Sequence, residues 1–197
     1  MKQVFVLLVS MLMLLSCSKE PEKSQEPVSA EKSIFEEVKE QTIMNPRDAE
    51  AWYHLADLYE KAQMHQEEAA ALQKVVEIDP GKGYAYLKLG NAYNRLGRYQ
   101  DAVTSFRTAI KYFPKNPVVY NNLAVSYGKL GKTAEEVALL EKAIALRPHY
   151  ATARHNLGIR MLALGKRGEA LKQYRELSEF DPVVAASLKK EIDAKGK

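Results

Sequence analysis

Apolar side chains recur at spacings of three and four residues through most of the chain between residues 49 and 184. This spacing places them on one face of an α-helix, so the segment predicts a series of amphipathic helices. Polar turns divide the series into pairs. The first helices are expected near 49–62, 83–96, 117–130 and 151–164, and the second helices near 66–79, 100–113, 134–147 and 168–181.

The pairs follow a period of 34 residues. A proline closes each period, because proline cannot continue a helix. A glycine stands between the two helices of a pair, where a turn with positive φ costs glycine little. The prolines are Pro46, Pro80, Pro114, Pro148 and Pro182, and the turn glycines are Gly97, Gly131 and Gly165.

Other positions of the period also share residue types. Leucine recurs at Leu55, Leu89, Leu123 and Leu157, followed by Ala56, Gly90, Ala124 and Gly158, and one aromatic column holds Trp52, Tyr86 and Tyr120, with Arg154 as its exception. The pattern resembles the tetratricopeptide repeat, and it matches at every signature position of the second unit. The repeat region is taken as 49–182, in units of 49–82, 83–116, 117–150 and 151–184.

The resemblance implies an all-α fold, a right-handed superhelix of antiparallel helix pairs. Helical solenoids also need a capping helix at each end, with a polar outer face that keeps the protein soluble. An N-terminal capping helix is expected within 33–48, with Ile34, Val38 and Met44 on its inner face. A C-terminal capping helix and tail are expected in 183–197, with Val184 and Leu188 inward.

One column departs from the repeat pattern. Glu68 and Glu136 occupy the position that is alanine in the second and fourth units, at Ala102 and Ala170. Burying an unpaired carboxylate is costly. We therefore expect a shifted helix start in these units, with the glutamate extending outward along its own stem.

The first residues form a separate segment. Eleven of the twelve residues from Val4 to Leu15 are apolar, which is too short a helix to cross a hydrocarbon core of about 30 Å. The segment therefore predicts a signal peptide over 1–16. Leu14-Leu15-Ser16-Cys17 resembles a bacterial lipobox, which implies covalent diacylglycerol and fatty acyl groups, such as palmitate, on Cys17. An ordinary secretory signal with an incidental cysteine is the alternative.

Residues 17–32 are then expected to be the lipidated cysteine and a disordered tether, because the polar sequence after Cys17 has little to bury. In lipoproteins of this kind, Ser rather than Asp after the cysteine usually directs sorting to the outer membrane. Ser18 thus implies a lipid-anchored protein of the outer membrane that faces the periplasm.

Charge is distributed unevenly along the chain. The formal net charge of +4 conceals 8 Lys/Arg against 15 Asp/Glu in residues 1–80, and 21 against 10 in residues 81–197. A basic surface of repeats is expected to meet an acidic protein or an envelope glycan, unless it is simply a solvated helical surface. Nucleic acid is not expected for a secreted lipoprotein. The candidate basic residues are Arg154, Arg160, Arg167 and Arg175.

No catalytic or metal-binding motif is recognisable. The single cysteine cannot form a disulfide within the chain, and the four histidines do not have metal-ligand spacing. Adjacent glutamates in a helix do not face each other, so they are not acid–base pairs. We expect no enzyme activity, no metal, and no cofactor beyond the lipid on Cys17.

The tetratricopeptide resemblance also implies a groove lined by the first helices of the units. Asparagines there carry both donors and an acceptor for the backbone of an extended peptide, and aromatic residues supply apolar anchors. A merely solvated surface is the alternative. The candidate groove residues are Tyr53, Tyr84, Leu87, Lys88, Asn91, Asn122 and Asn156.

Some members of the family bind C-terminal carboxylates through a clamp of basic residues and asparagines. Asn91 and Asn122 match two clamp positions, but Leu87, Thr152 and Asn156 stand where basic residues are required. We therefore do not expect this protein to bind C-terminal carboxylates through such a clamp. The sequence predicts a membrane-anchored scaffold or adaptor that binds partner proteins of the bacterial envelope. The alternatives are a homo-oligomeric structural element and a peptidoglycan-associated binding protein.

Overall fold

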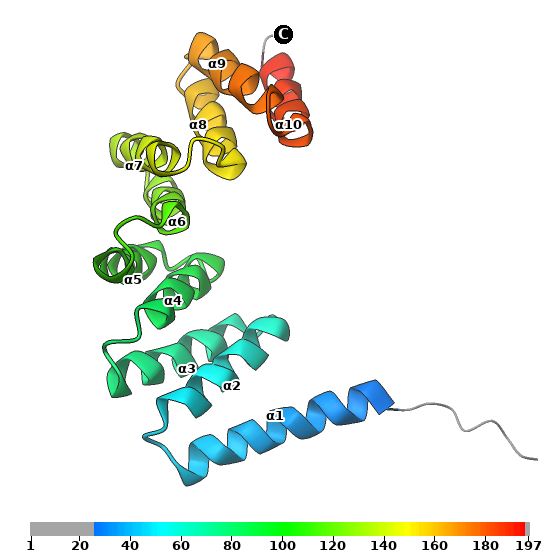
Figure 1. Cartoon of the computed structure of the whole chain (residues 1–197), viewed down its shortest axis with the longest axis vertical. Coiled ribbons are helices and arrows are strands. Elements are labelled where there is room, and N and C mark those ends of the chain that lie inside the picture. Colours follow the sequence, from blue (N-terminus) through cyan, green and yellow to red (C-terminus); the bar gives the residue numbers. More distant parts are fainter. Residues whose placement is uncertain (1–25, 196–197) are drawn as a thin grey trace, which may run out of the picture. The chain divides into compact units, whose positions relative to one another are not determined.

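The computed structural model describes the backbone of residues 26–195 and the side chains of residues 34–195 (Figure 1). The predicted signal peptide, Cys17 and the first part of the predicted tether lie outside these residues. In the described part of the chain there are ten helices and no strand. None of these helices is long and apolar enough to span a membrane.

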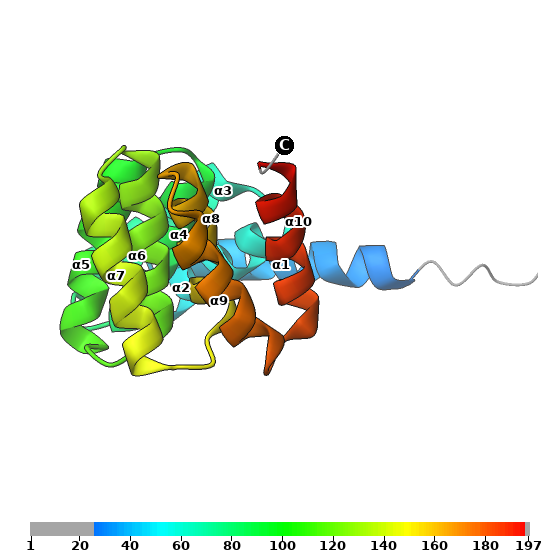
Figure 2. The same ribbon diagram turned by 90° about the horizontal axis from the view of Figure 1, so that it is seen from above.

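Four pairs of helices form the repeats. We call the first helix of each pair an A helix and the second a B helix. The A helices are α2 (Ala49–Lys61), α4 (Gly83–Arg95), α6 (Pro117–Lys129) and α8 (Ala151–Ala163), and the B helices are α3 (His65–Ile78), α5 (Tyr99–Tyr112), α7 (Thr133–Leu146) and α9 (Arg167–Ser178). Figures 1 and 2 both place α5 and α7 on one side of α4 and α6. The paired all-helical arrangement confirms the expected fold class.

The turns within the pairs repeat closely. Gly97, Gly131 and Gly165 have φ of 72°, 73° and 72°, as the sequence predicted, whereas Gln63 holds the same position in the first unit at φ 60°. At each turn the backbone N–H that follows this residue donates to the carbonyl five residues earlier, as Arg98 does to Tyr93 at 2.8 Å. This bond is the closing bond of a Schellman motif, which explains the need for a left-handed residue.

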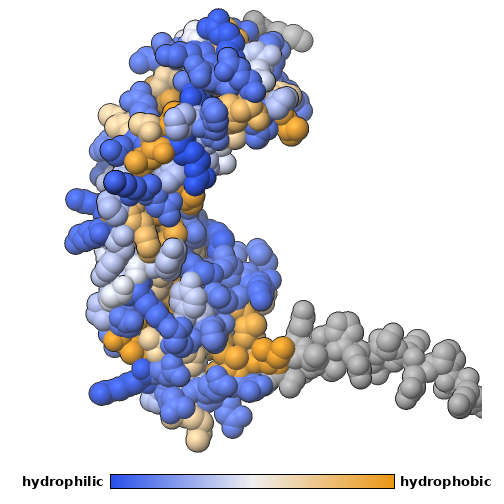
Figure 3. Space-filling view, viewed as in Figure 1, coloured by the Kyte–Doolittle hydropathy of each residue, from blue (hydrophilic) through white to orange (hydrophobic). Residues whose placement is uncertain are grey.

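The predicted apolar columns form the core. Val75, Ala109, Ala143 and Leu177, which share one column of the period, are all fully buried. The small-residue column explains how closely the helices approach. A Cβ added at Gly90 would lie 2.6 Å from the Phe106 ring. Polar side chains cover much of the face shown in Figure 3, with apolar patches among them.

Three of the four residues in the aromatic column donate to the carbonyl of the proline before their unit, whereas the carbonyl of Pro80 accepts from Tyr112 and not from Tyr86. The Trp52 indole N–H donates to the carbonyl of Pro46 at 3.1 Å, and the Tyr120 hydroxyl donates to that of Pro114 at 2.9 Å. Arg154 does the same with its Nε, which lies 2.7 Å from the carbonyl of Pro148. Arginine thus replaces an aromatic side chain as the donor that ties the start of a unit to the preceding proline.

The N-terminal helix differs from the prediction. Helix α1 (Glu26–Met44) begins seven residues before the expected capping segment, so residues 26–32 are helical rather than a disordered tether. Val38 is half-buried, as expected, but Met44 is 73% exposed and Ile34 is also exposed. The inward positions are instead Thr42, which is buried, and Phe35, whose ring meets that of Tyr59 edge-on at 5.2 Å.

The C-terminal helix agrees with the prediction. Helix α10 (Pro182–Ala194) begins where Asp181 accepts a hydrogen bond from the backbone N–H of Val184 at 3.0 Å. Leu188 and Ile192 are buried and Val184 is half-buried, so the apolar face of α10 covers the last repeat.

The expectation for Glu68 and Glu136 was wrong. The B helices begin at His65, Tyr99, Thr133 and Arg167, in regular steps of the period, so no helix start is shifted. Glu68 is only 1% exposed, and Glu136 is also buried. Both carboxylates tolerate burial because an arginine from the next unit pairs with each of them, Arg95 with Glu68 and Arg160 with Glu136.

Candidate functional site

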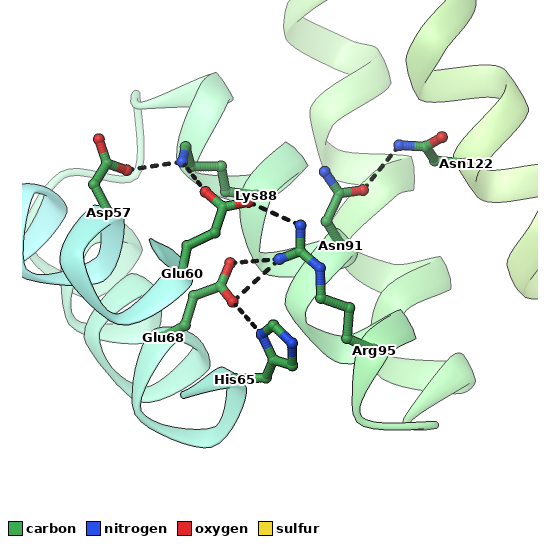
Figure 4. Close-up of polar contacts among 8 residues, drawn as sticks. All are labelled: Asp57, Glu60, His65, Glu68, Lys88, Asn91, Arg95 and Asn122. Carbon is green, nitrogen blue, oxygen red and sulfur yellow. Dashed lines mark hydrogen bonds and ion pairs between the residues drawn. The ribbon is translucent and has the colours of Figure 1, made fainter. Parts of the chain in front are cut away.

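Charged side chains of α2, α3 and α4 form a network between the first two units, which we call the charge network (Figure 4). Lys88 lies 2.7 Å from Asp57 and 2.6 Å from Glu60. Arg95 then joins two carboxylates, because its Nη2 donates to Glu60 at 2.8 Å and its Nη1 to Glu68 at 3.0 and 3.1 Å. The members are Asp57, Glu60, His65, Glu68, Lys88 and Arg95.

These contacts shift the pKa values of the charge network. Burial alone would lower the pKa of the Lys88 ammonium, but the hydrogen bonds that it donates to Asp57 and Glu60, together with the charges of these carboxylates, outweigh burial and raise the pKa. The hydrogen bond from Lys88 lowers the pKa of Glu60, against the opposing effect of burial and with help from Arg95. Lys88, a predicted groove residue, is therefore charged and paired with carboxylates of α2.

A second network consists of asparagines and continues along the A helices. Asn122 donates from Nδ2 to Oδ1 of Asn91 at 2.8 Å, as Figure 4 shows, and its own Oδ1 accepts from Nδ2 of Asn121 at 3.1 Å. Asn156 donates to Oδ1 of Asn121 at 3.0 Å. We call these four residues the asparagine network. The predicted ladder of Asn91, Asn122 and Asn156 is thus real, but Asn121 is needed to connect it.

The two ends of the asparagine network remain unsatisfied by protein. Within residues 26–195, no protein group accepts from Nδ2 of Asn91 or donates to Oδ1 of Asn156. Both side chains are only half-buried. The asparagine network therefore presents a donor at one end and an acceptor at the other, while its interior hydrogen bonds hold the amides in place.

Aromatic side chains line a pocket of about 520 Å³ where the first two units meet. Tyr84 is 62% exposed, and its ring stands 4.4 Å from that of Phe113, centroid to centroid. Tyr53 contacts two ammonium groups through its ring, with Lys82 Nζ at 5.5 Å and Lys88 Nζ at 5.7 Å. Burial raises the pKa of the Tyr53 phenol. We call this space the aromatic pocket.

The structure thus brings Tyr53 and Tyr84 together, as predicted for two of the apolar anchors. Leu87, the third, is half-buried and packs against the core, so it is less available than expected. Sequence reasoning singled out Glu68 without giving it a partner, and it assigned no contacts to Glu60 or Asn121. Their partners lie 27 to 35 residues away, close to one period, and that spacing is the signal that would have found them.

Three of the four predicted basic-surface arginines are engaged within the protein. The side chain of Arg154 is only 11% exposed and contacts Pro148, Gln173 and Glu176, so its assignment to the surface was wrong. Arg160 pairs with Glu136, and Arg167 with the carbonyl of Ile192 and with Asp193. Arg175 is exposed, as expected.

The described residues show no sign of a metal centre. Among residues 26–195 there is no cluster of three His, Cys, Asp or Glu side chains with a geometry that holds a metal ion. His65 contacts Glu68 at 3.0 Å, and the His149 ring stacks on that of Phe180 at 4.8 Å. The chemistry of the A helices is therefore that of hydrogen bonding, ion pairing and aromatic contact.

Comparison of the fold with solved structures finds close neighbours at low sequence identity. MamA from Desulfovibrio magneticus RS-1 is 16% identical, with a TM-score of 0.74 over 79% of this chain and 88% of that one. PilW, described as a widely conserved type IV pilus biogenesis factor, is 17% identical, with a TM-score of 0.72 over 85% and 79%. YrrB, a TPR protein with an unusual peptide-binding site, is 24% identical, with a TM-score of 0.62 over 80% and 86%.

At these identities the likeness shows the fold alone, and no curated protein matches the sequence. Family models add independent support. Models described as TPR repeat or tetratricopeptide repeat match residues 36–82, 71–104, 90–131 and 118–147, which overlap into one continuous stretch. Proteins of this kind are scaffolds that bind other proteins and are typically not enzymes. The chain is therefore a member of the tetratricopeptide repeat family, a helical scaffold for protein binding.

Proposed function

We propose that this protein is a lipid-anchored scaffold of the bacterial envelope, and that it holds a segment of a partner protein along its A helices. The observation that carries the proposal is the asparagine network with its two free ends. A bound backbone carbonyl would accept from Nδ2 of Asn91, and a bound backbone N–H would donate to Oδ1 of Asn156. These contacts recognise the main chain of an extended segment and require no particular side chain.

The aromatic pocket would add an anchor for one side chain of the partner. Its charged lining residues, Glu50 and Lys82, pair with each other, so the pocket favours a neutral side chain. The exposed Tyr84 ring beside Phe113 offers an apolar surface for an aromatic ring or a proline. The printed description of YrrB as a protein with a peptide-binding site lends this reading support by analogy of fold.

The membrane anchor is a proposal from the sequence, because Cys17 lies outside the described residues. The lipobox-like Leu14-Leu15-Ser16-Cys17 and the serine at position 18 support attachment to the outer membrane. One acyl chain binds a membrane only marginally, and the several chains of a bacterial lipoprotein give stable anchoring. We expect Cys17→Ser to move the protein from the membrane fraction to the soluble periplasm. Retention of the variant in the outer membrane would contradict the proposal.

Photo-crosslinking in cells tests the binding site. A photoreactive phenylalanine analogue at Tyr84, in the aromatic pocket, is expected to capture a partner protein. The same analogue at Lys111, an exposed position of a B helix, is the matched control. Capture at Tyr84 should fall in the double variant Asn122→Ala/Asn156→Ala, which breaks the asparagine network, and should persist in Asn45→Ala, an exposed asparagine outside it.

Two results would overturn the proposed binding site. One is equal capture of the partner from Tyr84 and from Lys111, because equal capture would mean that the partner contacts the protein nonspecifically. The other is capture at Tyr84 that the asparagine double variant leaves unchanged. Capture of a second copy of this chain alone would point instead to a homo-oligomeric structural element.

A further inference from the structure

We propose that a pocket between α6 and α8 binds a carboxylate of the partner segment, and this inference rests on the proposed function. The pocket has a volume of about 450 Å³. We call it the α6–α8 pocket, and its lining residues are Val125, Gly128, Lys129, Glu136, Leu140, Asn156, Ile159, Arg160 and Ala163. Asn156, the acceptor end of the asparagine network, is one of them. A partner segment that uses this end therefore reaches the α6–α8 pocket.

The first two units show which partners a buried glutamate requires at the repeat position shared by Glu68 and Glu136. Glu68 accepts two hydrogen bonds from Nη1 of Arg95, and His65 lies 3.0 Å from its other side. The remaining terminal nitrogen of Arg95, Nη2, is bound by Glu60 at 2.8 Å. Both carboxylates thus come from the chain itself, and both terminal nitrogens of Arg95 are occupied. The site is closed to a ligand.

The third and fourth units also pair a buried glutamate with an arginine of the next unit, but the arginine comes from another repeat position, because Ala163 stands at the position of Arg95. One carboxylate is missing. Glu136 stands at the unit position of Glu68, and Arg160 approaches it through Nε at 2.6 Å. The residue at the unit position of Glu60 is Gly128, which has no side chain. Among residues 34–195, no protein group pairs with Nη1 or Nη2 of Arg160. Arg160 therefore contacts a carboxylate through Nε alone, and both of its terminal nitrogens are without a protein partner.

Packing explains why the protein itself cannot supply the second carboxylate. A Cβ added at Gly128 would lie 2.6 Å from the carboxylate of Glu136, so any side chain there would displace the buried glutamate. The carboxylate of Glu136 lies against Gly128, where the first unit carries the side chain of Glu60, and the α6–α8 pocket opens beside both residues. A ligand carboxylate that enters the pocket would pair with a terminal nitrogen of Arg160, as Glu60 pairs with Nη2 of Arg95.

The charges of the pocket favour the same ligand. Its charged lining residues are Lys129, Glu136 and Arg160, which leave one positive charge in excess. Arg160 is 26% exposed, so its free edge is accessible yet partly desolvated, and Lys129 is exposed. The planar guanidinium fork matches a carboxylate, and such charge-assisted hydrogen bonds are the strong ones. The source is an Asp or Glu side chain or the C-terminal carboxylate of the partner.

A peptide array tests the inference. Random nonapeptides are made with free C-termini and again as carboxamides, and both sets are probed with the purified Cys17→Ser protein. We expect Asp and Glu to be enriched among the peptides that bind, or binding to depend on the free C-terminus. The first result identifies a side-chain carboxylate and the second a terminal one. The strongest acidic binder and its Asn or Gln isostere, or its carboxamide, are then compared by fluorescence anisotropy.

Variants assign the preference to the pocket. Arg160→Gln should weaken the acidic peptide roughly tenfold, because a hydrogen bond to a charged group is lost, and should leave the neutral isostere unchanged. Lys129→Gln should weaken the acidic peptide severalfold, and because Lys129 is exposed this variant keeps the fold if Arg160→Gln does not. Lys142→Gln, an exposed lysine of α7 outside the pocket, should have no effect.

The outcomes separate the two proposals. If peptides bind but acidic and neutral forms bind equally, the carboxylate site is overturned and the proposed scaffold function stands. The same conclusion follows if Arg160→Gln and Lys129→Gln weaken both forms equally or neither. If no peptide of any charge binds, both proposals fail.

Discussion

Replacing Arg95 with alanine should destabilise the protein more than its exposure suggests. Arg95 is 37% exposed, but its partner Glu68 is 1% exposed and cannot reach water. Removing one partner of a fully buried ion pair costs about 3–5 kcal/mol. Because solvent reaches Arg95 and His65 stays beside Glu68, we place the loss at the lower end, at about 3 kcal/mol.

The reverse change should cost less. Glu68→Ala introduces the residue that the second and fourth units carry, and it leaves Arg95 bound to Glu60 and open to water. We expect a loss of about 1–2 kcal/mol from the missing side chain and its hydrogen bonds. The double variant Glu68→Ala/Arg95→Ala should cost much less than the sum of the single changes, with a coupling free energy of about 2 kcal/mol.

Thermal unfolding followed by far-ultraviolet circular dichroism measures these differences. For a protein of this size, 1 kcal/mol corresponds to about 2–4 °C in Tm, so Arg95→Ala should lower Tm by about 6–12 °C. Lys74→Ala is the control, because Lys74 and Glu77 form an ion pair that is exposed on both sides, and it should change little. The reasoning is refuted if Arg95→Ala lowers Tm no more than Lys74→Ala, or if the single losses simply add.

Three further changes test the turns, the packing and the charge network. Gln63→Gly should raise stability by about 1 kcal/mol, because Gln63 holds φ 60° where the other units have glycine; a lower Tm would contradict this. Gly90→Ala should cost about 1–3 kcal/mol in urea unfolding, because its Cβ would lie 2.6 Å from the buried Phe106 ring; no loss would mean that the ring moves freely. The hydrogen bond from Lys88 lowers the pKa of Glu60, so the stabilisation from Glu60 is present above its ordinary value of 4.5 and is lost as pH falls through the lowered pKa. The Tm difference between wild type and Glu60→Gln should therefore shrink below pH 4.5, and a difference that grows would have the wrong sign.

The asparagine network shows how much of the candidate site can be predicted from the positions of residues within the repeat. Asn91, Asn122 and Asn156 were identified because the resemblance places their columns on the A helices, and their contacts follow that order. Asn121 was left out of the predicted ladder, although it shares the repeat position of Tyr53 and Leu87, because only its contact with Asn156 shows that it connects the ladder. It is buried, and it is tolerated because it both donates to Asn122 and accepts from Asn156.

The basic residues show the opposite result. Arg154, Arg160 and Arg167 were counted as surface charge because nothing near them in sequence suggested a partner. Each is engaged by a group from a different helix or loop, at Pro148, Glu136 and Asp193 among others. The count of Lys and Arg residues therefore overestimated the number of positive side chains that are free at the surface of the last repeats.

The sequence by itself determined the helices, the turns and the core, because these depend on spacing within one 34-residue unit. Apolar residues three and four apart define a buried face, and a glycine or proline ends a helix by its own backbone geometry. Only the tertiary structure decided which polar side chains are buried and which remain free. Glu68 pairs with Arg95, whose other terminal nitrogen is held by Glu60, whereas Glu136 pairs with Nε of Arg160 beside an open pocket. The physical reason is that a buried charge is stable only with partners, and those partners come from the next unit of the stack.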